Sequence, residues 1–243
     1  MLRSLGDGLF GEQHGSSPAR ILALPGWMRS RSDFRDVLAG CDAIALDLPG
    51  FGGASPEPER AIGAAGYAAL VAPALDICTE RVVVLGHSYG GRVAVNLAAA
   101  RPERMAALVL TGVPRLVAAA KVPSPSTGYR LVRWLHRRGV VSDTRMEALR
   151  RRRGSDDYRN ATGVMRDVLV MAVNEHYEDV LPRVMCPVEL VWGDDDTAAP
   201  LAIAEAALSR FGSGAALTIV PGAGHLTPLT AAPALRAALD KHC

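Results

Sequence analysis

The stretch Arg81-Val-Val-Val-Leu-Gly-His-Ser-Tyr-Gly-Gly91 places a serine between an apolar run and an alanine-rich segment. Val82 to Leu85 is typical of a strand buried on both faces, and residues 90–100 favour a helix. Residues 86–90 between them follow the pattern G-x-S-x-G. So abrupt a turn from strand to helix strains the serine backbone, and the two glycines lack the Cβ atoms that would clash. We therefore predict that Ser88 is an exposed nucleophile.

The start of the expected helix adds an electrostatic argument. Helix N-termini present unpaired backbone N–H groups and a partial positive charge. Tyr89, the residue after the serine, brings its backbone N–H to this position. We expect this N–H to stabilise the negative oxygen that forms when a serine attacks a carbonyl carbon.

The composition indicates one compact domain. The chain has 243 residues, 49% of them hydrophobic, and a formal net charge of +2, which predicts no nucleic-acid partner. The four cysteines form no C-x-x-C pair and no zinc-like spacing, so we expect free thiols, no metal and no cofactor. Residues 1–15 lack the apolar core of a signal peptide, and no apolar run is long enough to span a bilayer. We expect a soluble, cytoplasmic protein that does not bind a membrane.

Strand patterns alternate with helical patterns along most of the chain. The expected strands are residues 19–24, 42–48, 82–85, 106–112, 187–193 and 216–220, and the expected helices are residues 32–38, 62–78, 90–100 and 231–241. Such alternation predicts a parallel sheet with helices on both faces. Residues 1–18 are polar and glycine-rich, and they supply at most a short edge hairpin.

The alternation stops between residues 113 and 186. This segment has helical patterns and much of the arginine but no convincing strand, so we interpret residues 114–186 as a helical insertion. A segment that follows a strand of a parallel sheet emerges at the carboxyl edge of that sheet. The insertion is therefore predicted to form a lid over Ser88.

A serine hydroxyl is a weak nucleophile at neutral pH, so Ser88 needs an adjacent base and a carboxylate that orients the base. His225 is the best candidate for the base because it lies in the glycine-rich loop 221–226, directly after the last expected strand. The other histidines adjoin the serine, lie near the chain ends or lie in the insertion. They are His87, which we expect to point elsewhere, His14, His242, His136 and His176.

The carboxylate is expected in the loop of residues 193–200, which contains three consecutive aspartates after an expected strand. The loop after Leu110 offers no carboxylate before Pro114. We choose Asp196 as the acid from its position between Gly193 and Pro200. The other two, Asp194 and Asp195, are interpreted as exposed turn or capping residues.

Ser88, Asp196 and His225 thus occur in the order nucleophile, acid, histidine, each after a separate expected strand. In this order and in five motifs the chain resembles the α/β-hydrolase family. The motifs are Leu24-Pro-Gly-Trp27, Asp47-Leu-Pro-Gly-Phe-Gly52, Gly86-His-Ser-Tyr-Gly-Gly91, Gly193 to Pro200 and Gly222-Ala-Gly-His225. The resemblance implies the α/β-hydrolase fold for residues 1–113 and 187–243, with the insertion as a helical cap.

The resemblance also implies a second oxyanion donor. In the family it comes from the loop after the strand that here ends at Leu24, which makes the backbone N–H of Trp27 the expected donor. Pro25 stands where the family commonly has histidine, so this chain must anchor the loop in another way. The haloalkane dehalogenases and epoxide hydrolases of the family use an aspartate nucleophile, and Ser88 argues against both.

The insertion offers two further candidates. Arg150-Arg-Arg-Arg153 lies among acidic residues and is interpreted first as a solvated face, because consecutive helical residues point about 100° apart. The other interpretation is a site for an acidic substrate group, or for the phosphopantetheine arm of an acyl carrier protein or CoA ester. Helically spaced apolar residues are candidates for an acyl pocket or, more simply, for lid core. They are Trp134, Leu135, Met165 and Leu169.

We therefore expect a cofactor-free serine hydrolase that cleaves a carboxylic ester, or a related small acyl substrate, through an acyl-enzyme on Ser88. The nearest alternative is a biosynthetic thioesterase. Carbon–carbon bond hydrolysis, lactone opening and non-hydrolytic lyase chemistry occur on the same framework. A receptor-like binding protein with incidental turnover is the alternative from another class, because fold alone does not assign function.

Overall fold

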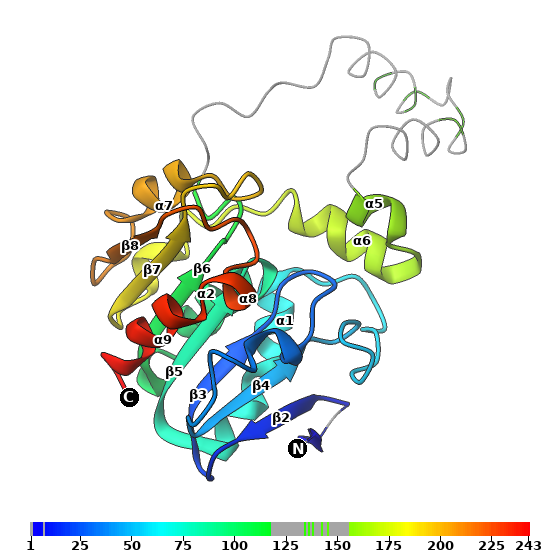
Figure 1. Ribbon diagram of the computed structural model, residues 1–243. Helices are drawn as coiled ribbons and strands as arrows, with labels where there is room; N and C mark the ends of the chain where they lie inside the picture. The colour runs from blue at the N-terminus through cyan, green and yellow to red at the C-terminus, as the bar shows by residue number, and fades with distance from the viewer. Residues whose placement is uncertain are drawn as a thin grey trace.

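The computed structural model describes residues 2–6, 8–117, 134, 136, 138, 142, 145 and 156–243. Its centre is an eight-stranded sheet in the order β1-β2-β4-β3-β5-β6-β7-β8 (Figure 1). The strands are β1 Leu2–Ser4, β2 Phe10–His14, β3 Ala19–Leu24, β4 Ala43–Asp47, β5 Cys78–His87, β6 Met105–Thr111, β7 Val188–Gly193 and β8 Ala216–Val220. β1 and β2 pair antiparallel at one edge, and β3 to β8 are parallel. The predicted α/β-hydrolase architecture is confirmed.

The helices occupy both faces of the sheet. They are α1 Ala64–Val71, α2 Tyr89–Ala100, α5 Asp156–Asn160, α6 Gly163–Ala172, α7 Leu201–Ala207, α8 Thr227–Thr230 and α9 Ala232–Asp240, with short 3₁₀ turns η1 Arg31–Phe34, η2 Ala72–Ile77, η3 Pro102–Arg104 and η4 Leu181–Arg183. One helix was expected over residues 62–78, but the α-helix ends at Val71. Pro73 explains why the α-helix gives way to the 3₁₀ turn η2, because proline lacks the N–H that an α-helical hydrogen bond needs.

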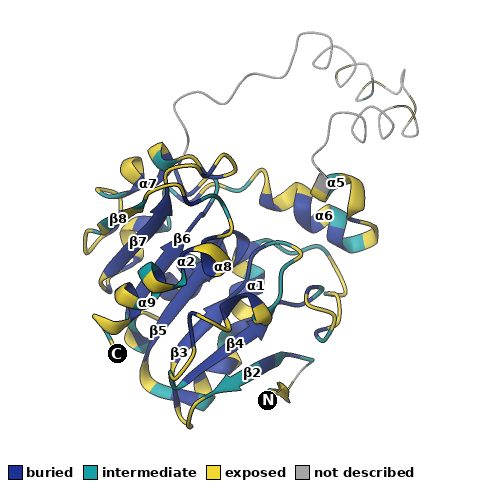
Figure 2. Cartoon of the chain, viewed as in Figure 1, coloured by how far each residue is buried: buried dark blue, intermediate teal, exposed yellow. Residues whose placement is uncertain are grey.

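Neighbouring residues of each central strand face opposite helical layers. Leu22 and Leu24 of β3 pack in the cluster that includes α1, α2 and α7, whereas Ile21 and Ala23 pack with η1 and α9. This alternation follows from the two-residue period of a strand. Both faces are covered, so β3 to β7 are mostly buried, while the outer strands β1 and β8 are largely exposed (Figure 2).

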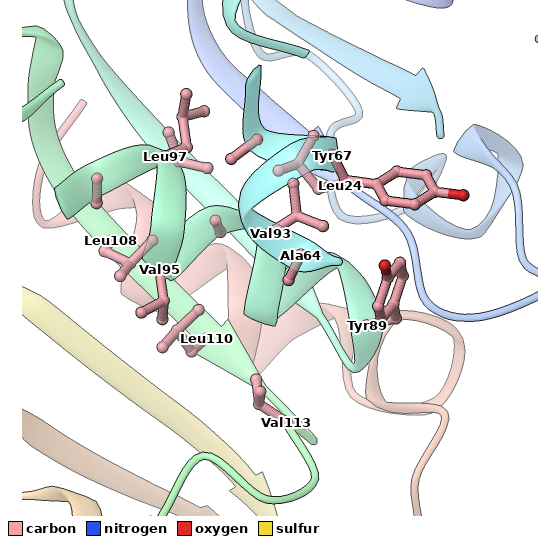
Figure 3. Close-up of a cluster of buried hydrophobic side chains, with 14 of the residues drawn as sticks. Leu24, Ala64, Tyr67, Tyr89, Val93, Val95, Leu97, Leu108, Leu110 and Val113 are labelled. Carbon is pink, nitrogen blue, oxygen red and sulfur yellow. The ribbon is translucent and has the colours of Figure 1, made fainter. Parts of the chain in front are cut away.

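The helical layer that contains α1 and α2 includes aromatic residues next to the turn at Ser88. Figure 3 shows Tyr67 and Ala64 of α1 beside Tyr89 and Val93 of α2. All four side chains are buried. Tyr89 follows Ser88 directly in the chain, so the core extends without a gap to the N-terminus of α2.

Arg92 of α2 fastens α6 to the body of the protein. It is only 6% exposed, and it donates to the carbonyl oxygens of Pro114 at 3.0 Å and Ala172 at 2.6 Å. Ala172 is the last residue of α6, so the guanidinium lies at the negative end of that helix. A second tie follows α6, where Glu175 accepts a hydrogen bond of 2.9 Å from the backbone N–H of Ala64. These contacts join the C-terminal end of α6 to both α1 and α2.

Within residues 114–186, the described part of the chain contains α5, α6 and η4 and no strand. None of the helices in the described ranges combines the length and the apolar character that crossing a bilayer requires.

Candidate active site

Ser88 lies between β5 and α2 with a left-handed backbone, φ 52° and ψ −115°. This conformation is costly for a residue with a Cβ, so the packing around it must hold it in place. The neighbouring backbones come very close: a Cβ at position 90 would lie 2.1 Å from the carbonyl oxygen of Leu24, and one at position 86 would lie 2.5 Å from the Cα of Gly91. Only glycine fits at Gly86 and Gly90.

The structure brings the three predicted residues together from three loops at one edge of the sheet. Ser88 follows β5, Asp196 follows β7 and His225 follows β8. The hydroxyl of Ser88 lies 3.0 Å from Nε2 of His225, and Nδ1 of the same ring lies 2.8 Å from Oδ2 of Asp196. A carboxylate at Nδ1 requires a proton there, which leaves Nε2 free to accept the serine proton.

The three aspartates of the β7 loop have different surroundings. Asp196 is 3% exposed, and its second oxygen accepts hydrogen bonds from the backbone N–H groups of Ala198 and Ala199 at 2.9 and 2.8 Å. These bonds fix the carboxylate so that Oδ2 faces the histidine. Asp194 is exposed and caps the backbone N–H of Gly222 at 2.7 Å, and Asp195 is exposed.

The predicted oxyanion donors lie at two adjacent strand ends. Tyr89 is the first residue of α2, and Trp27 lies in the loop after β3, which pairs with β5. Among the described residues, neither backbone N–H has a hydrogen-bond partner. Two unpaired N–H groups beside Ser88 are available for an oxygen atom that gains negative charge.

Charged side chains anchor the loop that carries Trp27. The backbone N–H and the guanidinium of Arg31 both donate to Asp47, which is fully buried at the end of β4. Arg29 forms a two-pronged contact with Asp33 at 2.6 and 2.8 Å. These two ion pairs anchor the loop, in which Pro25 replaces the histidine that is common in the family. The motif around Asp47 was recognised from the sequence, but its partner was not.

An aromatic cluster lies on the α1 side of Ser88. The ring centroids of Trp27 lie 4.8 Å from Phe51 and 5.5 Å from Tyr89, and Tyr67 lies 5.4 Å from Tyr89. Met165 of α6 reaches this cluster, with its sulfur 3.8 Å from the hydroxyl of Tyr67. Of the predicted pocket residues within the described ranges, Met165 therefore contacts this aromatic cluster next to the serine.

The other predicted pocket residues differ in their placement. Leu169 is buried one turn after Met165 on α6. Trp134 is 47% exposed, and the guanidinium of Arg138 lies 4.1 Å from its ring centroid. Leu135 and Arg150-Arg-Arg-Arg153 lie outside the described residues, so both assignments stay predictions. Within the described ranges, no group of three His, Cys, Asp or Glu side chains is arranged to hold a metal ion.

Two contacts around His225 had no signal in the sequence. His87 is hydrogen-bonded to the main chain of the histidine loop, where its Nε2 lies 2.9 Å from the carbonyl oxygen of His225. Thr111 at the end of β6 and Thr227 share a hydrogen bond of 2.5 Å between buried hydroxyls. Both contacts hold the histidine loop against the strand ends.

The burial of His87 makes folding stability depend on pH. Burial, and to a smaller extent the nearby His225, lowers the pKa of His87 from 6.5 to about 4. In the unfolded chain this imidazole takes up a proton as the pH falls through about 6.5, whereas in the folded protein it does so only near pH 4. Between these values the unfolded state binds more protons, so the free energy of unfolding decreases as the pH falls.

We expect this group to lower the free energy of unfolding by about 2 kcal/mol between pH 7 and pH 5. Urea denaturation of the wild-type protein and of His87→Gln at both pH values isolates the effect, because the variant keeps every other titratable group. An equal loss of stability in both proteins would mean that His87 does not resist protonation.

Comparison with known families agrees with this geometry. Residues 21–239 match the family described as Alpha/beta hydrolase family. The 2-hydroxy-6-oxononadienedioate/2-hydroxy-6-oxononatrienedioate hydrolase of Cupriavidus pinatubonensis is 28% identical over 217 residues, which cover 77% of this chain and 70% of that protein.

Two solved structures share the fold over nearly the whole chain. A thermophilic esterase from Thermogutta terrifontis has a TM-score of 0.67 at 22% identity, with 97% of this chain and 94% of that chain covered. Est816, described as an N-acyl homoserine lactone degrading enzyme, has a TM-score of 0.71 at 17% identity, with 97% and 96% covered. With a family match over residues 21–239, the chain belongs to the alpha/beta hydrolase family.

Proposed function

We propose that the protein is a serine hydrolase that cleaves a carboxylic ester, or a related acyl compound, through an acyl-enzyme on Ser88. The observation that carries this proposal is the unbroken series of contacts from the Ser88 hydroxyl through His225 to the Asp196 carboxylate, at 3.0 and 2.8 Å. A base within hydrogen-bond distance, itself oriented by a carboxylate, is what turns a serine hydroxyl into a nucleophile. The unpaired backbone N–H groups of Trp27 and Tyr89 then stabilise the negative charge that develops on the carbonyl oxygen of the substrate.

The reaction follows from these positions. His225 accepts the Ser88 proton at Nε2 while the serine oxygen attacks the substrate carbonyl. The carbonyl oxygen becomes negative and is held by the two backbone N–H groups, and Asp196 stabilises the charged imidazole. His225 then donates its proton to the leaving group, which leaves an acyl group on Ser88. Water, deprotonated by the same histidine, releases the acid and restores the serine.

Hydrolysis of a carbon–carbon bond is the second candidate, and the named activity of the Cupriavidus pinatubonensis relative favours it. The same attack on a ketone also gives an acyl-enzyme, but the leaving group is then a carbon atom. Carbon departs only where a neighbouring carbonyl delocalises its electron pair, so this reaction needs a diketone or an extended equivalent. Ester cleavage needs no such substrate feature, and we place it first.

The first test is a substrate panel. We expect measurable turnover of p-nitrophenyl esters, with kcat/KM depending on acyl length because the partly exposed ring of Trp27, packed against Tyr89 next to Ser88, offers an apolar surface to the acyl chain. A comparison of oxoesters with thioesters of the same acyl groups separates esterase from thioesterase activity. The thioesters include CoA esters. A dienedioate of the kind named for the relative tests carbon–carbon cleavage. Faster cleavage of that compound than of every ester would replace the first candidate by the second, and binding without turnover would favour the receptor-like alternative.

The second test concerns the nucleophile and its base. Ser88→Ala and His225→Ala should each lower kcat by about 10⁴-fold, because the members of such a triad act as a unit. A fluorophosphonate probe should label the wild-type protein at one serine and should leave Ser88→Ala unlabelled. Labelling that persists in Ser88→Ala would show that another serine is the nucleophile.

The third test compares the aspartates of one loop. Asp196→Asn should lower kcat by about 10³- to 10⁴-fold, because an amide cannot hold the imidazole in the required protonation state. Asp194→Asn is the matched control. Its side-chain oxygen still accepts the Gly222 N–H, and we expect a change in kcat of less than about threefold. Equal losses in the two variants would remove the assignment of Asp196 as the acid.

A further inference from the structure

Within the described residues, His87 makes one side-chain hydrogen bond, and its acceptor is the main chain of His225. The distance from Nε2 to the carbonyl oxygen is 2.9 Å. A carbonyl oxygen only accepts, so Nε2 carries the proton and donates it. The neutral ring therefore has no proton on Nδ1.

The other nitrogen of the ring is left unsatisfied. His87 is 1% exposed, and within the described residues its Nδ1 has no hydrogen-bond partner. Gly26, in the loop after β3, closes this side, since a Cβ there would lie 3.0 Å from Nδ1. A buried acceptor without a partner is destabilising, so an apolar ring would fill this space more favourably. What distinguishes histidine from an apolar residue at this position is therefore the hydrogen bond to His225, because an apolar residue would fill the space as well.

The histidine loop is held at a second point two residues later. Thr111 pairs with His87 across β5 and β6, and its hydroxyl shares a hydrogen bond with Thr227. The carbonyl oxygen of Thr111 accepts the backbone N–H of Ser88 at 3.0 Å. Two neighbouring strand ends therefore fix the loop at residues 225 and 227, and the same two strand ends fix Ser88.

We propose that His87 is a positioning residue, whose Nε2–H fixes the main chain of His225 so that the imidazole reaches Ser88 and Asp196 at the same time. This proposal rests on the proposed function, in which His225 is the base. The imidazole meets two partners at 3.0 and 2.8 Å, and a shift of its main chain would lengthen at least one of those contacts. Displacement of a reacting group by about 1 Å can lower a rate by about 100-fold.

The lowered pKa of His87, about 4, fits this task. The ring stays neutral over the working range of a histidine base, so the same nitrogen remains the donor while His225 gains and loses its proton. The ring centroids lie only 5.1 Å apart, and a second positive ring there would oppose the charged imidazole that the reaction needs.

Three substitutions at one position separate positioning from packing. The terminal nitrogen of glutamine is as many bonds from Cα as Nε2 of histidine, so His87→Gln keeps the donor. Asparagine is one atom too short, and methionine has no donor. His14→Gln, which removes a half-buried histidine from β2, is the control.

The readouts are the rate of fluorophosphonate labelling at Ser88, and kcat and KM on the best ester per labelled site. We expect His87→Asn and His87→Met to lower both the labelling rate and kcat by about 10- to 100-fold, with KM changed less than about threefold. His87→Gln should restore most of this loss, and His14→Gln should match the wild type.

Two results would overturn the proposal: wild-type rates in His87→Asn, or a loss in His87→Gln as large as that in His87→Met. If the shorter and apolar variants do not fold, His87→Gln decides alone, because a tenfold slower labelling rate would contradict a role based on the donor. Absence of labelling in the wild-type protein would instead remove the proposed function itself.

Discussion

The backbone of Ser88 is the constraint on which the active-site edge depends. A φ of 52° in a non-glycine residue costs on the order of 1–3 kcal/mol, and such a conformation persists only where its surroundings leave no alternative. Here the N–H of Ser88 is held by Thr111, its carbonyl accepts the N–H of Gly91 at 3.1 Å, and the main chain of Leu24 lies against Gly90. The turn is thus part of the sheet packing and needs no substrate to form.

A parallel sheet explains why residues so distant in the chain meet. Every strand from β3 to β8 ends at the same edge, so the loops after β3, β5, β7 and β8 lie side by side. What distinguishes this edge is how the loops are held: Asp47, Asp196 and His87 each bind backbone groups of a nearby loop segment. The scaffold thereby fixes the main chain of these loops, and the main chain in turn sets the positions of the reacting side chains.

Much of this arrangement could be predicted from the sequence because short, local sequence patterns determine it. The strand over residues 216–220 has the predicted bounds, and the order of Ser88, Asp196 and His225 along the chain led to the three residues that meet in the structure. The break at Pro73 was also visible in principle, since proline removes an N–H that a continuing α-helix would need. Short helices such as α7 and α8 carry too few turns to show a period.

The contacts around the triad were beyond prediction for a physical reason. The residues of the Thr111–Thr227 pair are 116 positions apart, and those of the His87–His225 contact are 138 apart. No local pattern encodes such pairs, because they depend on the direction in which a side chain leaves the end of a strand. Arg31 is a similar case: its aspartate partner belongs to a recognisable motif, yet nothing near Arg31 in the sequence points to it.

The attachment of α6 through Arg92 has an evolutionary consequence. Both acceptors of the guanidinium, at Pro114 and Ala172, are carbonyl oxygens of the main chain, which every amino acid provides. Substitutions on the exposed side of this helix can therefore alter the protein surface while the helix stays in place. A lineage of such proteins is free to vary the exposed side of α6 at little risk to folding, provided that Arg92 and the Glu175 contact with α1 are kept.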